Sequence, residues 1–233
     1  MDDSPILTRR ELLKRVTLVG TAVAIPVRLV EIESTANTAA VQGVTAVPAT
    51  FETLTAAEGE TLQAIVARLI PTDASGPGAT EARAAQYIDR ALGGALATSR
   101  DAYRVGLATL DGYTQASRKT SFARLPAADQ DAVLRELEMD VAPGFAGAAI
   151  FFNLVLSHTI QGTFADPYYG GNANFVGWDL IGYPGVRLAV AAGDQQLNAR
   201  PSPTHQSAYD FVMFSNKKPA RAQLDANEHD HAG

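Results

Sequence analysis

The segment from Phe145 to Phe164 is the feature that most restricts how this chain can fold. Its apolar side chains fall on most sides of a helix rather than on a single stripe, at Ala148, Ile150, Phe151, Phe152, Leu154, Val155 and Leu156. A helix of this kind has to be covered by other elements. Asp166-Pro167 ends the pattern, because proline lacks a backbone N–H and disfavours helical geometry in the residue before it. We therefore predict a central helix that others surround.

Four further segments have the spacing of helices with one buried face. The first follows Thr55-Ala56-Ala57-Glu58, which matches a capping box. It places Leu62, Ile65, Val66 and Leu69 on one face before Pro71 ends it. Residues 72–78 are predicted to form a loop, and the other helices are expected at about 80–96, 100–117 and from Pro126 through Leu137. The predicted fold class is mainly α, a compact bundle of about five helices.

The stretch from Tyr168 to Trp178 differs in character from the helical segments. It is rich in glycine and aromatic residues and lacks the strict alternation of a strand, so we predict a long, ordered but irregular C-terminal segment. Residues 217–233 are polar and are predicted to form a flexible tail. The helical domain is accordingly assigned to residues 53–216.

The first thirty or so residues have the layout of a twin-arginine export signal. Arg9 and Arg10 precede an apolar run from Val16 to Val27, which is shorter than the roughly 20 residues of a spanning helix. We predict a signal at residues 1–30, a spacer at 31–52, and export to the periplasm by the Tat translocase. Cleavage is expected in the small-residue stretch at 36–40. The alternative is a basic amphipathic helix of a cytoplasmic protein.

Composition narrows the chemistry open to the chain. A net charge of −6 argues against nucleic acid as a partner. The sequence contains no cysteine, which excludes disulfides, thiolate zinc sites, iron–sulfur ligation and haem attached through C-x-x-C-H. It also lacks G-x-G-x-x-G, a Walker lysine, G-x-S-x-G and H-E-x-x-H. We therefore predict no catalytic residue, no metal site and no cofactor in this chain itself.

A few polar residues are candidates for a site, although a structural role is the favoured interpretation of each. His158, with Asp166 after it, has the chemistry of a general base or ligand, but a lone histidine on an apolar helix is expected to be a satisfied core residue. His229 and His231 in the tail are interpreted as part of a solvated end. Calcium binding is disfavoured because the Asp-first spacing and the distal Glu of a calcium loop are missing around Asn172, Asn174 and Asp179.

Two clusters of residues resemble a known family. The first is Leu54-Thr55-Ala56-Ala57-Glu58, leading to Arg68-Leu69-Ile70-Pro71-Thr72-Asp73 and Gly76-Pro77-Gly78. The second comprises His158-Thr159-Ile160-Gln161-Gly162, Asp166-Pro167, Gly170-Gly171-Asn172, Gly177-Trp178 and Gly182-Tyr183-Pro184-Gly185. Together they are similar to the gluconate 2-dehydrogenase subunit 3 family, the small subunits of bacterial membrane-associated, flavin-dependent sugar and polyol dehydrogenases.

The resemblance implies a non-catalytic subunit in a larger complex. A flavoprotein of the glucose-methanol-choline (GMC) class would carry FAD and oxidise the sugar or alcohol, and a multihaem cytochrome c with haem c is expected as a third subunit in some complexes. This chain would bind the flavoprotein, assist its folding and export it through its own twin-arginine signal. Membrane association would come through the complex. The substrate would be set by the partner, so gluconate, glucose and glucosides remain open.

The aromatic residues of the C-terminal segment are the predicted docking surface for the flavoprotein, because tyrosine and tryptophan are favoured at interface hot spots. They are Tyr168, Tyr169, Phe175, Trp178 and Tyr183. An equally weighted interpretation is that these rings cover the open end of the helical core. Two further alternatives are a stand-alone periplasmic enzyme that uses His158 and Asp166, and a sugar-binding protein with Trp178 as its platform.

Overall fold

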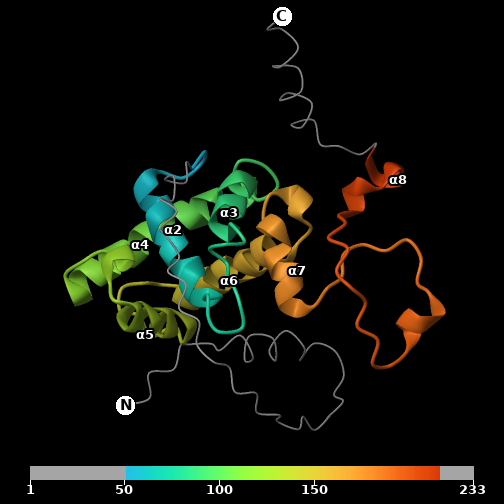
Figure 1. Cartoon of the computed structure of the whole chain (residues 1–233). Coiled ribbons are helices and arrows are strands. Elements are labelled where there is room, and N and C mark those ends of the chain that lie inside the picture. The colour runs from blue at the N-terminus through green and yellow to red at the C-terminus, as the bar shows by residue number, and fades with distance from the viewer. Residues whose placement is uncertain (1–50, 216–233) are drawn as a thin grey trace, which may run out of the picture.

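The computed structural model describes residues 51–215, and the helices carry the labels of Figure 1. The predicted signal with Arg9 and Arg10, nearly all of the predicted spacer, and the tail with His229 and His231 lie outside these residues. Within the described part the structure is helical and has no strand, as predicted. The helices are α2 (Ala56–Leu69), α3 (Ala84–Leu92), α4 (Arg100–Arg118), α5 (Ala127–Glu138), α6 (Ala148–Phe164), α7 (Val176–Ile181) and α8 (Val212–Ser215).

Helix α6 is the central helix that the apolar pattern predicts. It packs against α2, α3, α4, α5 and α7, and its residues Phe151, Phe152 and Val155 are buried in the main core. Its exposed stripe runs through Ile150 and Asn153 to Gln161. Phe145 is not the first residue of the helix but lies in a turn ahead of it, in which its carbonyl accepts a 3.3 Å bond from the N–H of Ala148. No helix in residues 51–215 is long and apolar enough to cross a bilayer.

Helix α2 begins and ends where its local chemistry predicts. The Thr55 hydroxyl accepts a 3.3 Å bond from the N–H of Glu58, and the Glu58 carboxylate accepts one of 2.8 Å from the N–H of Thr55. This reciprocal capping box satisfies two otherwise free donors at the helix N-terminus. The predicted buried face, from Leu62 to Leu69, lies in the core. The capping box and the buried face of α2 are therefore both confirmed.

Helix α3 is shorter at both ends than the predicted 80–96. The chain after Gly78 is tied to the end of α2, because the N–H of Ala79 donates a 2.9 Å bond to the carbonyl of Ile70. Arg83 then adopts a left-handed backbone (φ 58°), which separates the turns at 79–83 from the helix that begins at Ala84. Gly93 follows the last helical residue, Leu92. The prediction of one continuous helix over 80–96 is wrong.

A buried carboxylate fixes the start of the domain. Asp89 of α3 is 1% exposed and accepts bonds from three successive backbone N–H groups, those of Glu52 (2.6 Å), Thr53 (3.0 Å) and Leu54 (2.8 Å). Phe51 and Glu52, the last residues of the predicted spacer, therefore belong to the packed domain. In the last turn of α2, Arg68 forms a two-pronged ion pair with Asp131 of α5, with both N–O distances at 2.6 Å.

Candidate functional site

The glycine-rich residues after α6 form a tight backbone junction between α6 and α7. A Cβ on Gly171 would lie 2.2 Å from the carbonyl oxygen of Gly162, and one on Gly177 would lie 1.8 Å from that of Thr163. Real side chains do not tolerate such contacts, so only glycine allows these segments to touch the end of α6. The junction explains Gly162, Gly171 and Gly177 as packing residues.

Asn172 holds this junction together from its centre. The side chain is fully buried, and its amide Nδ2 donates a 3.0 Å bond to the carbonyl of Ala165 while its Oδ1 accepts a 2.7 Å bond from the N–H of Gly177. Its own N–H donates to the carbonyl of Gly162 at 2.7 Å. The amide of Asn172 is thus committed to the backbone rather than to an ion. Among the described residues, no group of three or more His, Asp or Glu side chains is placed to hold a metal.

His158 and Asp166 belong to two separate sets of tertiary contacts. His158 is buried, its Nδ1 lies 3.0 Å from the hydroxyl of Tyr103, and the two rings are stacked. Burial lowers the pKa of His158 and raises that of Tyr103. The Asp166 carboxylate instead accepts from the N–H of Tyr168, the hydroxyl of Ser207 and the N–H of Ala208, at 3.0, 2.7 and 3.0 Å. The structure therefore does not pair His158 with Asp166.

Trp178 is a core residue of the C-terminal segment. It is 4% exposed, and its indole N–H donates a 3.0 Å bond to the carbonyl of Phe164. The ring of Tyr183 packs almost perpendicular to the indole with centroids 4.8 Å apart, and Phe175 packs at 5.4 Å. Trp178 lies in α7, so the stretch predicted to be irregular contains a short helix after all. The burial of Trp178 fits the interpretation that the rings cover the end of the core.

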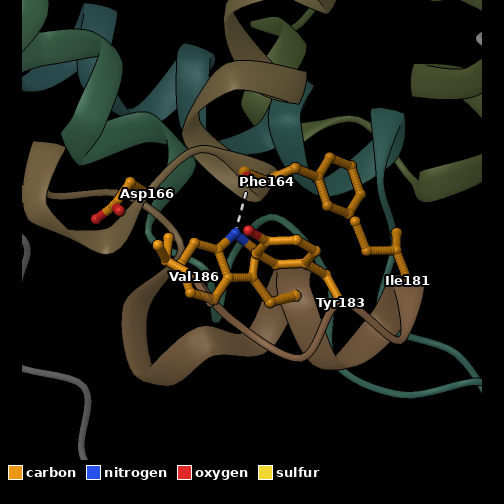
Figure 2. Close-up of a pocket in the computed structure, with 6 residues that line it drawn as sticks. Phe164, Asp166, Ile181, Tyr183 and Val186 are labelled. Carbon is orange, nitrogen blue, oxygen red and sulfur yellow. Dashed lines mark hydrogen bonds between the residues drawn. The ribbon is translucent and has the colours of Figure 1, made fainter. Parts of the chain in front are cut away.

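Phe164, Asp166, Trp178, Ile181, Tyr183 and Val186 line a cavity of about 360 Å³ beside α7. Tyr183 packs against the Trp178 indole, and Figure 2 shows the Asp166 carboxylate pointing away from Ile181 and Tyr183. The bonds of Asp166 to Ser207 and Ala208 account for that direction. His158 does not line this cavity. The lining is consequently mostly apolar, and His158 and Asp166 do not meet at this cavity.

Three tyrosines form a second aromatic cluster at the same end of the molecule. The rings of Tyr168 and Tyr209 are stacked with centroids 3.6 Å apart, and the hydroxyls of Tyr169 and Tyr209 lie 2.8 Å from each other. The hydrogen bond with Tyr169 raises the pKa of Tyr209 to about 12. Tyr169 is 53% exposed and Tyr183 is exposed as well. Docking through the five predicted aromatic residues stays a prediction, and these two offer the accessible surface for it.

Three residues of this region, His205, Ser207 and Tyr209, are not among those predicted from the sequence. The ring of His205 stacks on Phe175 at 4.7 Å, and its Nε2 lies 2.7 Å from the Asp179 carboxylate. Ser207 begins a short 3₁₀ turn in which the carboxylate of Asp210 accepts from the Ser207 N–H. The spacing Ser207-x-x-Asp210 has the form of a capping box and could have been noticed. The partners of His205 and Tyr209 are far away in sequence, so no local pattern identifies them.

Comparison with known families gives one match. The family model described as gluconate 2-dehydrogenase subunit 3 matches residues 56–185, more than half of the chain and all of the helices from α2 to α7. Neither the curated proteins nor the solved structures gave a match.

Proposed function

The chain belongs to the gluconate 2-dehydrogenase subunit 3 family, and on that premise we propose that it binds a flavoprotein dehydrogenase, assists its folding and exports it. The partner would be a GMC-type subunit that carries FAD and oxidises a sugar or an alcohol. A multihaem cytochrome c would accept the electrons in complexes that contain one. This chain would act in the periplasm as the accessory subunit of that complex.

The observation that carries the proposal is the family match over residues 56–185. The geometry supports it, because the motif residues that resemble the family are used to pack the domain. Gly171 and Gly177 allow close backbone contact, Asn172 holds the junction, and His158 is bonded inside the core. Because these motif residues stabilise the fold, the simplest way for the chain to act is to bind another protein through its exposed side chains.

The two alternative functions find less support. A stand-alone enzyme would need His158 and Asp166 to face a common cavity, and they belong to separate sets of tertiary contacts. A sugar platform on Trp178 would need an open ring face, and the indole is 4% exposed. The exposed rings of Tyr169 and Tyr183 are instead suited to contact with a protein partner, because tyrosine buries a large rigid surface while its hydroxyl keeps a polar contact.

Export is best tested by co-expressing the full chain with any GMC-type flavoprotein whose gene neighbours its own. Arg9 and Arg10 are either kept or both changed to Lys, and flavin fluorescence is followed in the periplasmic and cytoplasmic fractions. We expect the flavoprotein to reach the periplasm only with the intact pair. Arg104→Lys, an exposed arginine on α4, is the matched control and should leave export unchanged.

Two results would contradict the proposal. If the flavoprotein reaches the periplasm equally well with both arginines replaced, this chain does not carry it. If the purified chain alone binds FAD or oxidises sugars, it is not an accessory subunit.

A further inference from the structure

The segment that follows the matched residues leaves the helical bundle and returns to it. In Figure 1 the orange-to-red chain after α7 swings outward and comes back before α8. Its two ends are joined, because the N–H of Val186 donates a 2.8 Å bond to the carbonyl of Gln206 and the N–H of Thr204 donates one of 2.7 Å to that of Pro184. Residues 187–203 thus form a closed loop, here called the outer loop.

The base of the outer loop is fixed to the domain by several contacts. The Thr204 hydroxyl adds a 2.9 Å bond to the carbonyl of Pro184, and His205 lies between Phe175 and the Asp179 carboxylate. Directly afterwards, Ser207 donates to Asp166 at 2.7 Å. Because both ends of the loop are fixed, it has less conformational freedom to lose on binding than an untied segment of the same length, which favours affinity.

The outer loop presents apolar side chains to solvent. Leu197 is 99% exposed, and Leu188 and Val190 are more than half exposed. Arg187 and Asp194 form an ion pair inside the loop, which lowers the pKa of Asp194, and the Asp194 carboxylate also accepts a 3.1 Å bond from the N–H of Ala191. Apart from this mutually neutralised pair, Arg200 is the remaining charged residue of 187–203. Low charge with apolar side chains is the composition of an interface core.

We propose that the outer loop inserts into the dehydrogenase subunit, with Leu197 as its central contact and Leu188 and Val190 beside it. The choice of a dehydrogenase as the partner of the outer loop rests on the family, which is described as a subunit of a dehydrogenase. The matched residues end at 185, directly before the loop. The loop therefore adds a contact beyond the matched part of the domain, and it lets this chain recognise its own flavoprotein. This inference rests on the proposed function.

The test is the affinity of full-length variants for the co-expressed flavoprotein. Leu197→Asp and Leu188→Asp place a charge in the proposed contact while leaving the base of the loop intact. We expect each to weaken binding roughly tenfold or more, as removal of a hot spot does. Ile150→Asp is the matched control, because Ile150 is 77% exposed near the start of α6, away from α7. It should bind within about twofold of the wild type, since contacts outside hot spots are nearly neutral.

The outcomes separate the inference from the function on which it rests. If the wild-type chain does not bind the flavoprotein, the proposed function fails. If it binds and both loop variants bind equally well, or if Ile150→Asp weakens binding as much as they do, the outer loop is not the contact. Flotation with vesicles of phosphatidylethanolamine and phosphatidylglycerol tests a lipid surface instead. Wild-type binding to these vesicles that is lost in Leu197→Asp would assign the loop to the membrane and overturn the proposal.

Discussion

Replacing Asp89 with alanine is expected to destabilise the domain by about 4 kcal/mol. The carboxylate accepts from the N–H groups of Glu52, Thr53 and Leu54, and the bond to Leu54 is buried while the other two are partly buried. A hydrogen bond to a charged group contributes about 1.5–3 kcal/mol, and a buried donor left without a partner costs about 1–3 kcal/mol. The expected loss counts the full contribution of the buried bond to Leu54 and only a small part of the contribution of the two bonds that water can reach. A loss of this size is a large part of the about 5–15 kcal/mol that stabilises a typical domain.

Urea unfolding followed by circular dichroism measures this loss. Asp89→Asn should recover only part of it, because the amide oxygen can take the place of Oδ1, which accepts from Thr53 and Leu54, while the NH2 group then faces the N–H of Glu52. Asp101→Ala is the control, since the Asp101 side chain is 87% exposed and its ion pair with Arg104 lies on the surface. It should cost less than about 1 kcal/mol. A loss below about 1.5 kcal/mol for Asp89→Ala, or wild-type stability for Asp89→Asn, would refute the assignment of Asp89 as the anchor of residues 52–54.

Three further predictions concern the bundle. A Cβ on Gly106 would lie 2.2 Å from the Phe151 ring, whereas a Cβ on Gly112 of the same helix would meet open space. In urea unfolding, Gly106→Ala should therefore lower the free energy of unfolding by about 1–3 kcal/mol, and Gly112→Ala should raise it by up to about 1 kcal/mol. Equal effects of the two substitutions would contradict the packing of Gly106 on Phe151. Burial lowers the pKa of His158 from its ordinary value of 6.5. As the pH drops below about 6.5, the unfolded chain therefore binds a proton at this histidine more readily than the folded chain, and the stability decreases. His158→Gln should flatten that part of the stability–pH curve, and an unchanged slope would disprove this assignment. Trp178→Phe removes the hydrogen bond to the carbonyl of Phe164 and should lower the free energy of unfolding by about 1–3 kcal/mol. Thermal unfolding measures this loss, and an unchanged midpoint would contradict the importance of that bond.

The features that the sequence predicts correctly depend on nearby residues. The capping box at Thr55 and Glu58 needs only three residues of separation, and it forms as expected. The apolar spacing of α4 and α5 likewise places Leu107 and Leu134 in the core. Phe145–Phe164 is predicted as the central helix because a nearly all-apolar helix has to be covered on several sides, which is a local property with a consequence for the whole fold.

The features that the sequence misses depend on distant residues. The bond between Ser207 and Asp166 joins positions 41 residues apart, and the stacking of His205 on Phe175 is equally non-local. Arg83 interrupts the predicted second helix, because the tie of Ala79 to the end of α2 turns the chain before α3 begins. Such contacts appear only when the three-dimensional arrangement is known, and no periodicity in the sequence marks them.

Several of the residues that carry the family resemblance are not placed to select a partner. Gly171 and Gly177 have no side chain to offer, Asn172 is fully buried, and Trp178 is 4% exposed. The two glycines and Asn172 bring the backbone after α6 against the end of α6, so that α7 and the following chain emerge at one end of the bundle. On the proposed function, the side chains exposed at that end would select the partner. Tyr169, in the 3₁₀ turn Pro167–Tyr169 that follows α6, and Tyr183 are two of these, and the outer loop beyond the matched residues adds Leu188, Val190 and Leu197. The family match over residues 56–185 therefore does not give the substrate of the proposed complex, because the buried motif residues support the fold and the proposed partner contacts lie on the exposed surface.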